Sequence, residues 1–208
     1  MLAFFSGLGL GLSLIIAIGA QNAYVLRQGI RREHVLAVVI ICALSDAVLI
    51  VAGVAGLGFV IERMPWLVVV AQWLGAAFLL AYGLLAARRA LRGSDAGLHT
   101  EAGSRPQPGV RLAPVALTVL ALTWLNPHVY LDTVLMLGSI AATHGDARWV
   151  FAAGAVCASI LWFAALGYGA RHLGRWLDTP RAWRILDGAI AVIMIAIAVS
   201  LVVQAVSG

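Results

Sequence analysis

Six long apolar runs, separated by short polar segments, make up most of the chain. Each run reaches the roughly 20 apolar residues that a helix needs in order to cross a lipid bilayer. The pattern therefore predicts an all-α, polytopic membrane protein with six transmembrane helices embedded in a lipid bilayer. The runs cover Leu2–Tyr24, Val35–Ile61, Trp66–Ala87, Ala113–Ala142, Trp149–Ala170 and Ile185–Val206.

Composition supports a membrane location and argues against a nucleic-acid partner. Only 11% of the 208 residues are charged and 62% are hydrophobic, whereas soluble domains average roughly 25% charged residues. The net charge of +5 comes from 14 basic residues, all of them arginine, most of which flank the apolar runs. Cys42 and Cys157 lie inside apolar runs without a CxxC motif, so we expect free thiols and neither a metal site nor a cofactor.

The arginines are distributed very unequally between the two sides of a six-span chain. Loops one, three and five carry twelve of them, and the opposite side carries only Arg63 and Arg148. Because cytoplasmic loops are enriched in basic residues, this asymmetry predicts that loops one, three and five are cytoplasmic. Both chain termini are then expected to lie outside.

The long polar stretch at residues 88–112 divides the chain into two halves of three spans, residues 1–87 and 113–208. Its glycines and prolines indicate a cytoplasmic linker. Asn22 and Val25 in the first half correspond to Asn126 and Val129 in the second. An odd number of spans per half turns the second half upside down, so the halves are predicted to be inverted repeats, an arrangement typical of transporters.

The first and fourth spans are expected to be broken. The fourth run has 30 residues, about 45 Å as a helix, which exceeds the ~30 Å hydrocarbon core. Asn126-Pro127 is the expected break, because Asn favours the N-cap position and Pro the first helical position. Gly19–Asn22 is the equivalent segment in the first span. Helix N-termini at such breaks attract anions; a proline kink without any ligand is the alternative.

Asp46 is the acid in the apolar stretch VIICALSDAVLIVAG, 11 residues into the second span, or about 16 Å along a helix. A carboxyl group at this depth is costly and usually functional, so we predict a site for a cation, a proton, or both in turn, with Ser45 helping to satisfy it. The alternative is a protonated Asp46 that only joins two helices. Asp132 is a second candidate, which could instead serve as a cap, while Asp187 is expected at a helix start.

Three stretches together resemble the LysE-type exporters of lysine and arginine: IGAQNAYVLRQGIRREHVLAVVIICALSDAVLIVAG, LTWLNPHVYLD and RWVFAAGAVCASILWF. The resemblance implies export of L-lysine or L-arginine from a bacterial cytoplasm through the inner membrane. It also implies no enzymatic activity. In one departure, Ala20 follows Gly19 where the family usually has proline. By the same resemblance, the substrate or proton site is formed by Gln21, Asn22, Asp46, Asn126, Pro127 and Asp132, and Ser45 joins them as the neighbour of Asp46.

A proton antiport mechanism suits such a substrate. Exporting a cation against an inside-negative potential costs about 2.3 kcal/mol per 100 mV, and an incoming proton cancels this electrical cost. The main alternative is an exporter of neutral amino acids such as homoserine or threonine, in which Asp46 serves protons only. A metal-ion exporter, a membrane-embedded enzyme and a scaffold protein are further alternatives, and small-residue helix faces would permit a homodimer.

Overall fold

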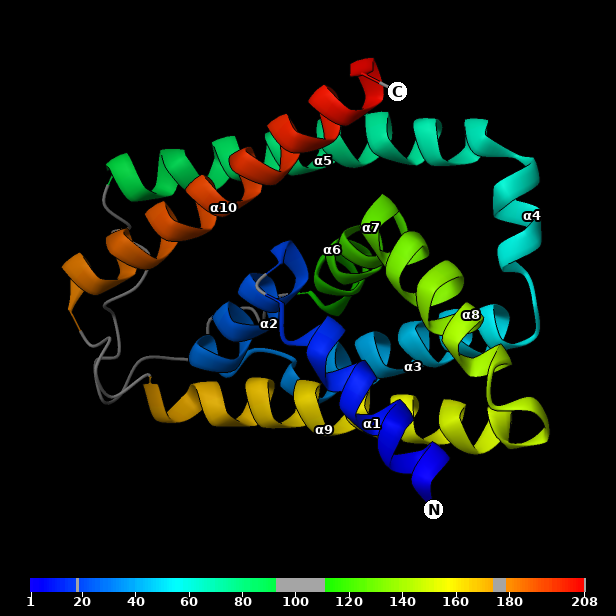
Figure 1. Ribbon diagram of the computed structural model, residues 1–208. Helices are drawn as coiled ribbons and strands as arrows, with labels where there is room; N and C mark the ends of the chain where they lie inside the picture. The colour runs from blue at the N-terminus through cyan, green and yellow to red at the C-terminus, as the bar shows by residue number, and fades with distance from the viewer. Residues whose placement is uncertain (18, 93–110, 174–178, 208) are drawn as a thin grey trace.

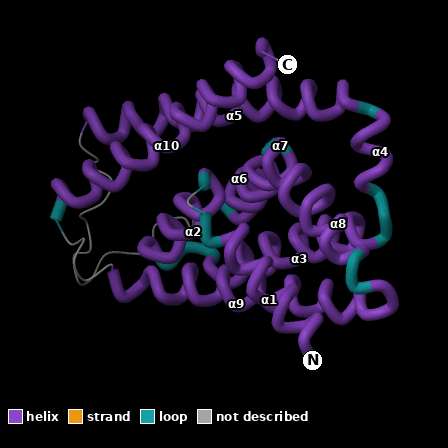
Figure 2. Tube along the Cα trace, in the orientation of Figure 1, coloured by secondary structure: helices purple, strands orange, loops and turns teal. Residues whose placement is uncertain are grey.

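The computed structural model describes residues 1–17, 19–92, 111–173 and 179–207, and every regular element in these ranges is helical (Figures 1 and 2). The all-α prediction is confirmed. The elements are α1 (Leu2–Ile15), α2 (Ala20–Arg31), α3 (Val35–Val54), α4 (Gly58–Arg63), α5 (Pro65–Arg92), α6 (Leu112–Trp124), α7 (Pro127–Val129), the π-helix η1 (Tyr130–Met136), α8 (Leu137–Ala142), the 3₁₀-helix η2 (Gly145–Ala147), α9 (Arg148–Leu173) and α10 (Pro180–Ser207).

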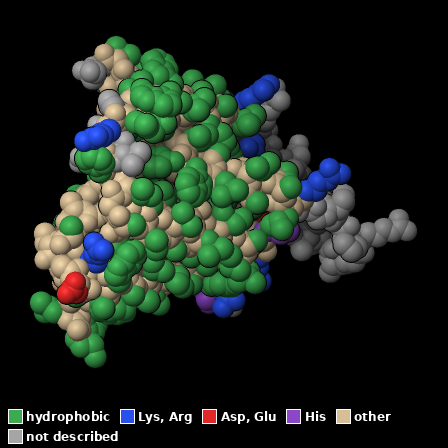
Figure 3. Space-filling model, turned by 90° about the vertical axis from the view of Figure 1, so that its right-hand side faces the viewer, with side chains coloured by type: hydrophobic (Ala, Val, Ile, Leu, Met, Phe, Trp, Pro, Cys, Tyr) green, Lys and Arg blue, Asp and Glu red, His purple; other side chains and the backbone are tan. Residues whose placement is uncertain are grey.

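Four of these helices are each long and apolar enough to cross a membrane: α3, α5, α9 and α10. Many of their large apolar side chains lie on the outside of the molecule, where a soluble protein would carry polar groups. Figure 3 shows hydrophobic side chains over most of the visible face. An apolar exterior of this kind fits a lipid environment.

Two further candidate spans are helix pairs bent at a break. The axes of α1 and α2 differ by 84°, and α6 and the helical segment Pro127–Ala142 differ by 57°. Counting each bent pair as one span gives up to six spans. At the second break, Asn126 is the N-cap and Pro127 the first helical residue, which confirms the break predicted there. At the first, Gly19 has an extended backbone and Ala20 begins α2, so this break also lies where the sequence places it.

Several helix ends differ from the sequence prediction. The second run was expected to continue to Ile61, but α3 ends at Val54 and the chain turns before α4. Gly56 has φ +95 in this turn, a conformation open mainly to glycine. Residues 88–92, assigned to the linker, continue α5, while residues 93–110 of the linker lie outside the described part of the chain. Helix α10 begins at Pro180 rather than near Ile185.

Small residues bring the helices into close contact. A Cβ atom on Gly7 would meet the Phe151 backbone, and one on Gly11 would lie 3.0 Å from the Ala158 side chain, so α1 packs tightly across α9. Helix α3 packs against α9 and against the second bent pair, where Gly53 meets Gly138. Helices α5 and α10 lie side by side, above the other helices in the view of Figure 1. Ala20 and Pro127, the first residues of the helices that follow the two breaks, are both buried, so these helices begin inside the molecule.

Candidate functional site

A cavity of about 470 Å³ lies where the two broken helix pairs meet α3, α9 and α10. This volume falls within the roughly 300–1,000 Å³ of typical small-molecule sites. The cavity brings together five of the seven predicted site residues; Ser45 and Pro127 are not among its lining residues. Its polar or charged lining residues are Gln21, Asn22, Asp46, Asn126, His128, Asp132, Thr133 and Ser200.

Asp46 faces the interior of the protein rather than lipid. Its exposed fraction is 8%, whereas Leu44 and Val48 on the same helix are 62% and 54% exposed. The apolar side chains thus occupy the outward face of α3, and the carboxyl group points into the cavity. Because the carboxyl group reaches a cavity, a small cation or a proton carrier can approach it.

The hydrogen-bond partner of Asp46 comes from the other half of the chain. The Ser159 hydroxyl on α9 donates to Asp46 Oδ2 at 2.7 Å. Ser45, expected to assist Asp46, instead accepts a hydrogen bond of 3.2 Å from Trp124 Nε1. Ser159 was not identified from the sequence, because no local pattern connects residues so far apart. One oxygen of Asp46 is therefore held in place by Ser159. Ser45 instead binds Trp124, the last residue of α6 before the second break.

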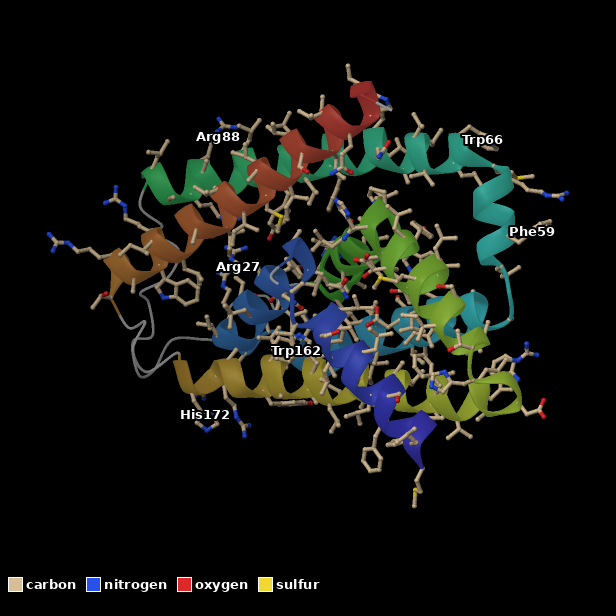
Figure 4. The ribbon with its side chains drawn as sticks, viewed as in Figure 1. Arg27, Phe59, Trp66, Arg88, Trp162 and His172 are labelled. Atoms are coloured by element: carbon tan, nitrogen blue, oxygen red, sulfur yellow. The ribbon has the colours of Figure 1, made fainter. Side chains whose placement is uncertain are left out.

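Asn22 stabilises the first break. Its Nδ2 donates to the backbone oxygens of Ile15 at 2.8 Å and Ala17 at 2.9 Å, which are carbonyl groups left unpaired at the end of α1. Trp162 on α9, labelled in Figure 4, donates from Nε1 to Asn22 Oδ1 at 3.3 Å. Asn22 therefore lines the cavity with its amide group already engaged.

Among the described residues, hydrogen-bond donors without a partner at the first break come from the start of α2 and from Gln21, next to Asn22. Helix α2 has no side-chain cap at its N-terminus, so the backbone N–H groups of its first turn remain available at the cavity wall. Gln21 Nε2 is buried and has no hydrogen-bond partner within the described residues. This corner of the cavity therefore offers hydrogen-bond donors, which suit a carboxylate group.

At the second break, unlike the first, a side chain caps the N-terminus of the helix that follows. Asn126 Oδ1 accepts from the His128 backbone N–H at 3.1 Å, and the Tyr130 hydroxyl donates to the Trp124 carbonyl oxygen at 2.7 Å. The chain then continues as a π-helix from Tyr130 to Met136. Such π-helical segments often occur at functional sites.

Asp132 lies within this π-helix and lines the same cavity as Asp46. It is half-buried, and within the described residues no hydrogen bond or ion pair engages its carboxylate. Two carboxyl groups and a set of hydrogen-bond donors in one cavity provide complementary partners for a molecule that carries cationic groups and a carboxylate.

Two charged residues were misplaced by the sequence analysis. Asp187 was expected at a helix start and Arg27 in a cytoplasmic loop, but both are buried inside helices. Arg27 Nη2 lies 3.2 Å from Asp187 Oδ1, and Arg89 Nε lies 3.4 Å from the same oxygen. The errors arose because the apolar runs were shorter than the helices: the first run ended at Tyr24, whereas α2 continues to Arg31, and the sixth began at Ile185, whereas α10 begins at Pro180.

Groups of side chains that could bind a metal ion are absent from the described residues. Within the described ranges, no three His, Cys, Asp or Glu side chains gather in a way that could hold a metal ion. Cys42 and Cys157 are free thiols, as predicted. The polar residues that line the cavity carry carboxylate, amide, hydroxyl and imidazole groups.

Comparison with known proteins agrees with this geometry. The LysE type translocator family matches residues 12–205. The chain is 48% identical over 196 residues to a protein of Mycobacterium tuberculosis named as a candidate amino-acid transporter, covering 94% of each chain. It is 39% identical to the lysine exporter LysE of Corynebacterium diphtheriae, covering 96% of this chain and 98% of the relative.

A third relative is named as an exporter of a different amino acid, arginine. The arginine exporter protein ArgO of Yersinia enterocolitica is 41% identical, with 97% of this chain and 96% of the relative covered. No solved structure matches the chain significantly. The family match covers both helix breaks and all the residues that line the cavity. The chain therefore belongs to the family of LysE type translocators.

Proposed function

We propose that this protein exports the basic amino acids L-lysine and L-arginine from a bacterial cytoplasm across the inner membrane, in exchange for protons. The observation that carries the proposal is the position of Asp46, buried in an apolar helix and yet lining a cavity together with Asp132. Relatives named as lysine and arginine exporters support this substrate class.

A six-span topology follows if each bent pair crosses the membrane. The first bent pair contacts α9 near Phe151 through Gly7 and near Gly167 through Gly29. These two points are 16 residues apart on α9, about 24 Å along the helix, which approaches the ~30 Å thickness of the hydrocarbon core. This separation favours a crossing helix over a re-entrant loop.

The second bent pair supports the same interpretation. Val115 on α6 belongs to the same buried cluster as Val38 on α3, whereas Gly138 on α8 meets Gly53 near the other end of α3. The pair thus follows α3 along most of its length. With six spans and the arginine distribution, the ends of α2, α5 and α9 face the cytoplasm and both termini face outward.

The packing also supports two inverted repeats, residues 1–87 and 113–208. The first bent pair packs on α9, the second helix of the second half, and the second bent pair packs on α3, the second helix of the first half. Helix α5 packs on α10, so the third helices of the two halves pair with each other. A pseudo-two-fold relation between the halves predicts this reciprocal pattern.

The substrate is proposed to bind between the two breaks. Its carboxylate lies at the uncapped N-terminus of α2, close to Gln21, because free N–H groups and the partial positive charge of the helix favour an anion there. Its cationic groups lie at Asp46 and Asp132. Ala20 contributes an N–H group that a proline at that position would lack.

Asp46 is proposed to hold either a proton or the substrate cation, but never both. Low-dielectric surroundings disfavour an unpaired carboxylate, so release of the cation on the outer side favours uptake of a proton. The protonated form then carries the proton inward, where a new substrate cation replaces it. The electrical work of moving the cation is thereby cancelled by the returning proton.

An efflux experiment tests the substrate class. Cells or proteoliposomes that contain the protein are loaded with labelled arginine, lysine, homoserine or threonine, and release is followed with and without a proton gradient. We expect gradient-dependent release of arginine and lysine and background release of the two neutral amino acids. Release of homoserine or threonine alone would instead assign the protein to neutral amino-acid export.

A further inference from the structure

Most arginines lie at the end of the protein where α2, α5 and α9 finish and α10 begins, called here the arginine-rich end. The ion-pair cluster Arg27–Asp187–Arg89 lies between the cavity and this end. On α2, Arg27 follows the cavity-lining Asn22 by five residues, about 7.5 Å further along the helix. On α10, Asp187 precedes the cavity-lining Ala196 by nine residues, about 13 Å in the same direction. The cluster therefore occupies the route from the cavity to that end.

The cluster joins three helices that are otherwise brought together mainly by apolar contacts. Arg27 comes from α2, Arg89 from α5 and Asp187 from α10, and Figure 4 shows Arg27 between α2 and the α5–α10 pair. The side chains of Arg27 and Asp187 are only 9% and 4% exposed. Both ion pairs use the same oxygen, Asp187 Oδ1, so one carboxylate serves two cations.

Two tyrosines, Tyr24 and Tyr82, pack next to the ion pairs. Arg27 Nη1 donates to the Tyr82 hydroxyl at 3.3 Å, and the Arg89 guanidinium lies 5.6 Å from the centre of the Tyr82 ring. The Tyr24 and Tyr82 rings pack edge to face at 5.8 Å. The Gln28 amide donates to the Tyr24 hydroxyl at 2.8 Å. Polar and aromatic side chains from α2 and α5 thus fill the space next to the cluster.

The chemistry of the cluster suits a contact that forms and breaks. The attraction in a buried ion pair is largely offset by the loss of hydration of both charges, so paired and hydrated states differ little in free energy. The pairing here is also incomplete, because Arg27 Nε and Arg89 Nη2 are buried without partners among the described residues. Water that enters on opening would satisfy both groups, which lowers the free energy of the open state.

From this arrangement, we propose that Arg27, Arg89 and Asp187 form a cytoplasmic gate. The Arg27–Asp187 pair holds the α5–α10 pair against α2 and closes the cavity toward the cytoplasm, while Arg89 fixes Asp187 from α5; the Arg27–Asp187 pair separates when the cavity opens to that side. This inference rests on the proposed function for its membrane orientation and its alternating access. It assigns a role to three charged residues that do not line the substrate cavity.

Site-directed labelling tests the gate without any assumption about the substrate. Ser200 lines the cavity, and a Ser200→Cys reporter is placed in a chain that also carries Cys42→Ala and Cys157→Ala. A membrane-impermeant maleimide is added to inside-out or right-side-out vesicles, so that it reaches the protein from one side only. With the gate intact, we expect slow labelling from the cytoplasmic side.

Asp187→Asn and Arg27→Gln should each open the gate, because each removes the ion pair between α2 and α10. Cytoplasmic-side labelling should rise by about tenfold, within the range of typical coupling between protein states, and arginine export should fall. Arg27→Gln leaves the Arg89–Asp187 pair intact, so Asp187 keeps a partner, and this variant decides the question if Asp187→Asn fails to reach the membrane. Arg88→Gln is the matched control, because Arg88 is exposed and extends from the outer side of α5 (Figure 4).

The outcomes separate the gate from the proposed function. Unchanged cytoplasmic-side labelling in a folded Arg27→Gln protein would overturn the gate, and so would fast cytoplasmic-side labelling when all three gate residues are unaltered. An equal rise in Arg88→Gln would also overturn it, since the effect would then reflect loss of any arginine. Increased labelling in a protein that exports no basic amino acid would keep the gate and reject the proposed substrate.

Discussion

The Ser159 hydroxyl donates a 2.7 Å hydrogen bond to Asp46 across two helices from opposite halves of the chain. Both side chains are buried, and the bond is formed where α3 packs against α9. A hydrogen bond to a charged group contributes about 1.5–3 kcal/mol. If Asp46 exchanges a proton for a cation as proposed, this bond places the exchange in direct contact with a helix of the other half.

Replacing Ser159 with alanine should impair transport without abolishing folding. Ser159→Ala removes the partner of Asp46, so we expect an arginine efflux rate about tenfold lower, matching a loss of roughly 1.4 kcal/mol. The measurement is the initial rate in proteoliposomes, normalised to the amount of protein. Ser45→Ala is the control, because Ser45 precedes Asp46 but bonds to Trp124; equal losses in both variants would contradict the specific role of Ser159.

Asp132→Asn should weaken binding of cationic substrates. Asp132 lines the cavity without a partner of its own among the described residues, so its charge is available to the substrate. Loss of a charged hydrogen bond is expected to raise the KM for arginine about tenfold or more. Concentration-dependent efflux measures this change; an unaltered KM would show that Asp132 does not contact the substrate.

The cap at the second break can be tested separately from substrate chemistry. Asn126→Ala removes the acceptor for the His128 N–H, and loss of an N-cap costs about 1 kcal/mol. We expect a lower midpoint of thermal unfolding in detergent. Asn126→Ser retains a capping oxygen and should largely restore the midpoint, so a serine variant as unstable as the alanine variant would argue against the cap.

Close packing of α1 on α9 makes Gly154 intolerant of a side chain. A Cβ atom there would meet the Phe4 backbone and lie 2.9 Å from the Leu8 nitrogen. Gly154→Ala should therefore lower stability by about 1–3 kcal/mol, as overpacking usually does. Gly169→Ala on the same helix has open space around it and should have little effect. Similar unfolding midpoints for the two variants would contradict this packing.

Features with a local chemical cause were predicted correctly from the sequence. The Asn126-Pro127 break follows from the preferences of these two residues for the N-cap and first helical positions, and the structure places it there. Gly7 and Gly11 are four residues apart, a spacing that lets two helices approach closely, and both meet α9.

Features that depend on distant parts of the chain were missed. The Ser159–Asp46, Trp162–Asn22 and Arg27–Asp187 pairs join residues from opposite halves. Hydrophobic periodicity reports which face of a helix is apolar, but not which helix it meets. Asp187 shows the consequence most clearly, because a span drawn from hydropathy begins near Ile185, whereas the helix begins at Pro180 and buries this carboxylate among arginines.

The central proposal is that a proton and the substrate cation share one site, Asp46. Its most direct test is to measure arginine release and proton uptake simultaneously in proteoliposomes, with the unaltered protein and with Asp46→Asn. An asparagine at this position resembles aspartate in shape but can neither carry a proton nor neutralise a cation. We expect coupled fluxes for the unaltered protein and loss of both coupled fluxes for the variant, at equal protein levels in the membrane. Arginine release coupled to proton uptake at the original rate in Asp46→Asn would contradict the account.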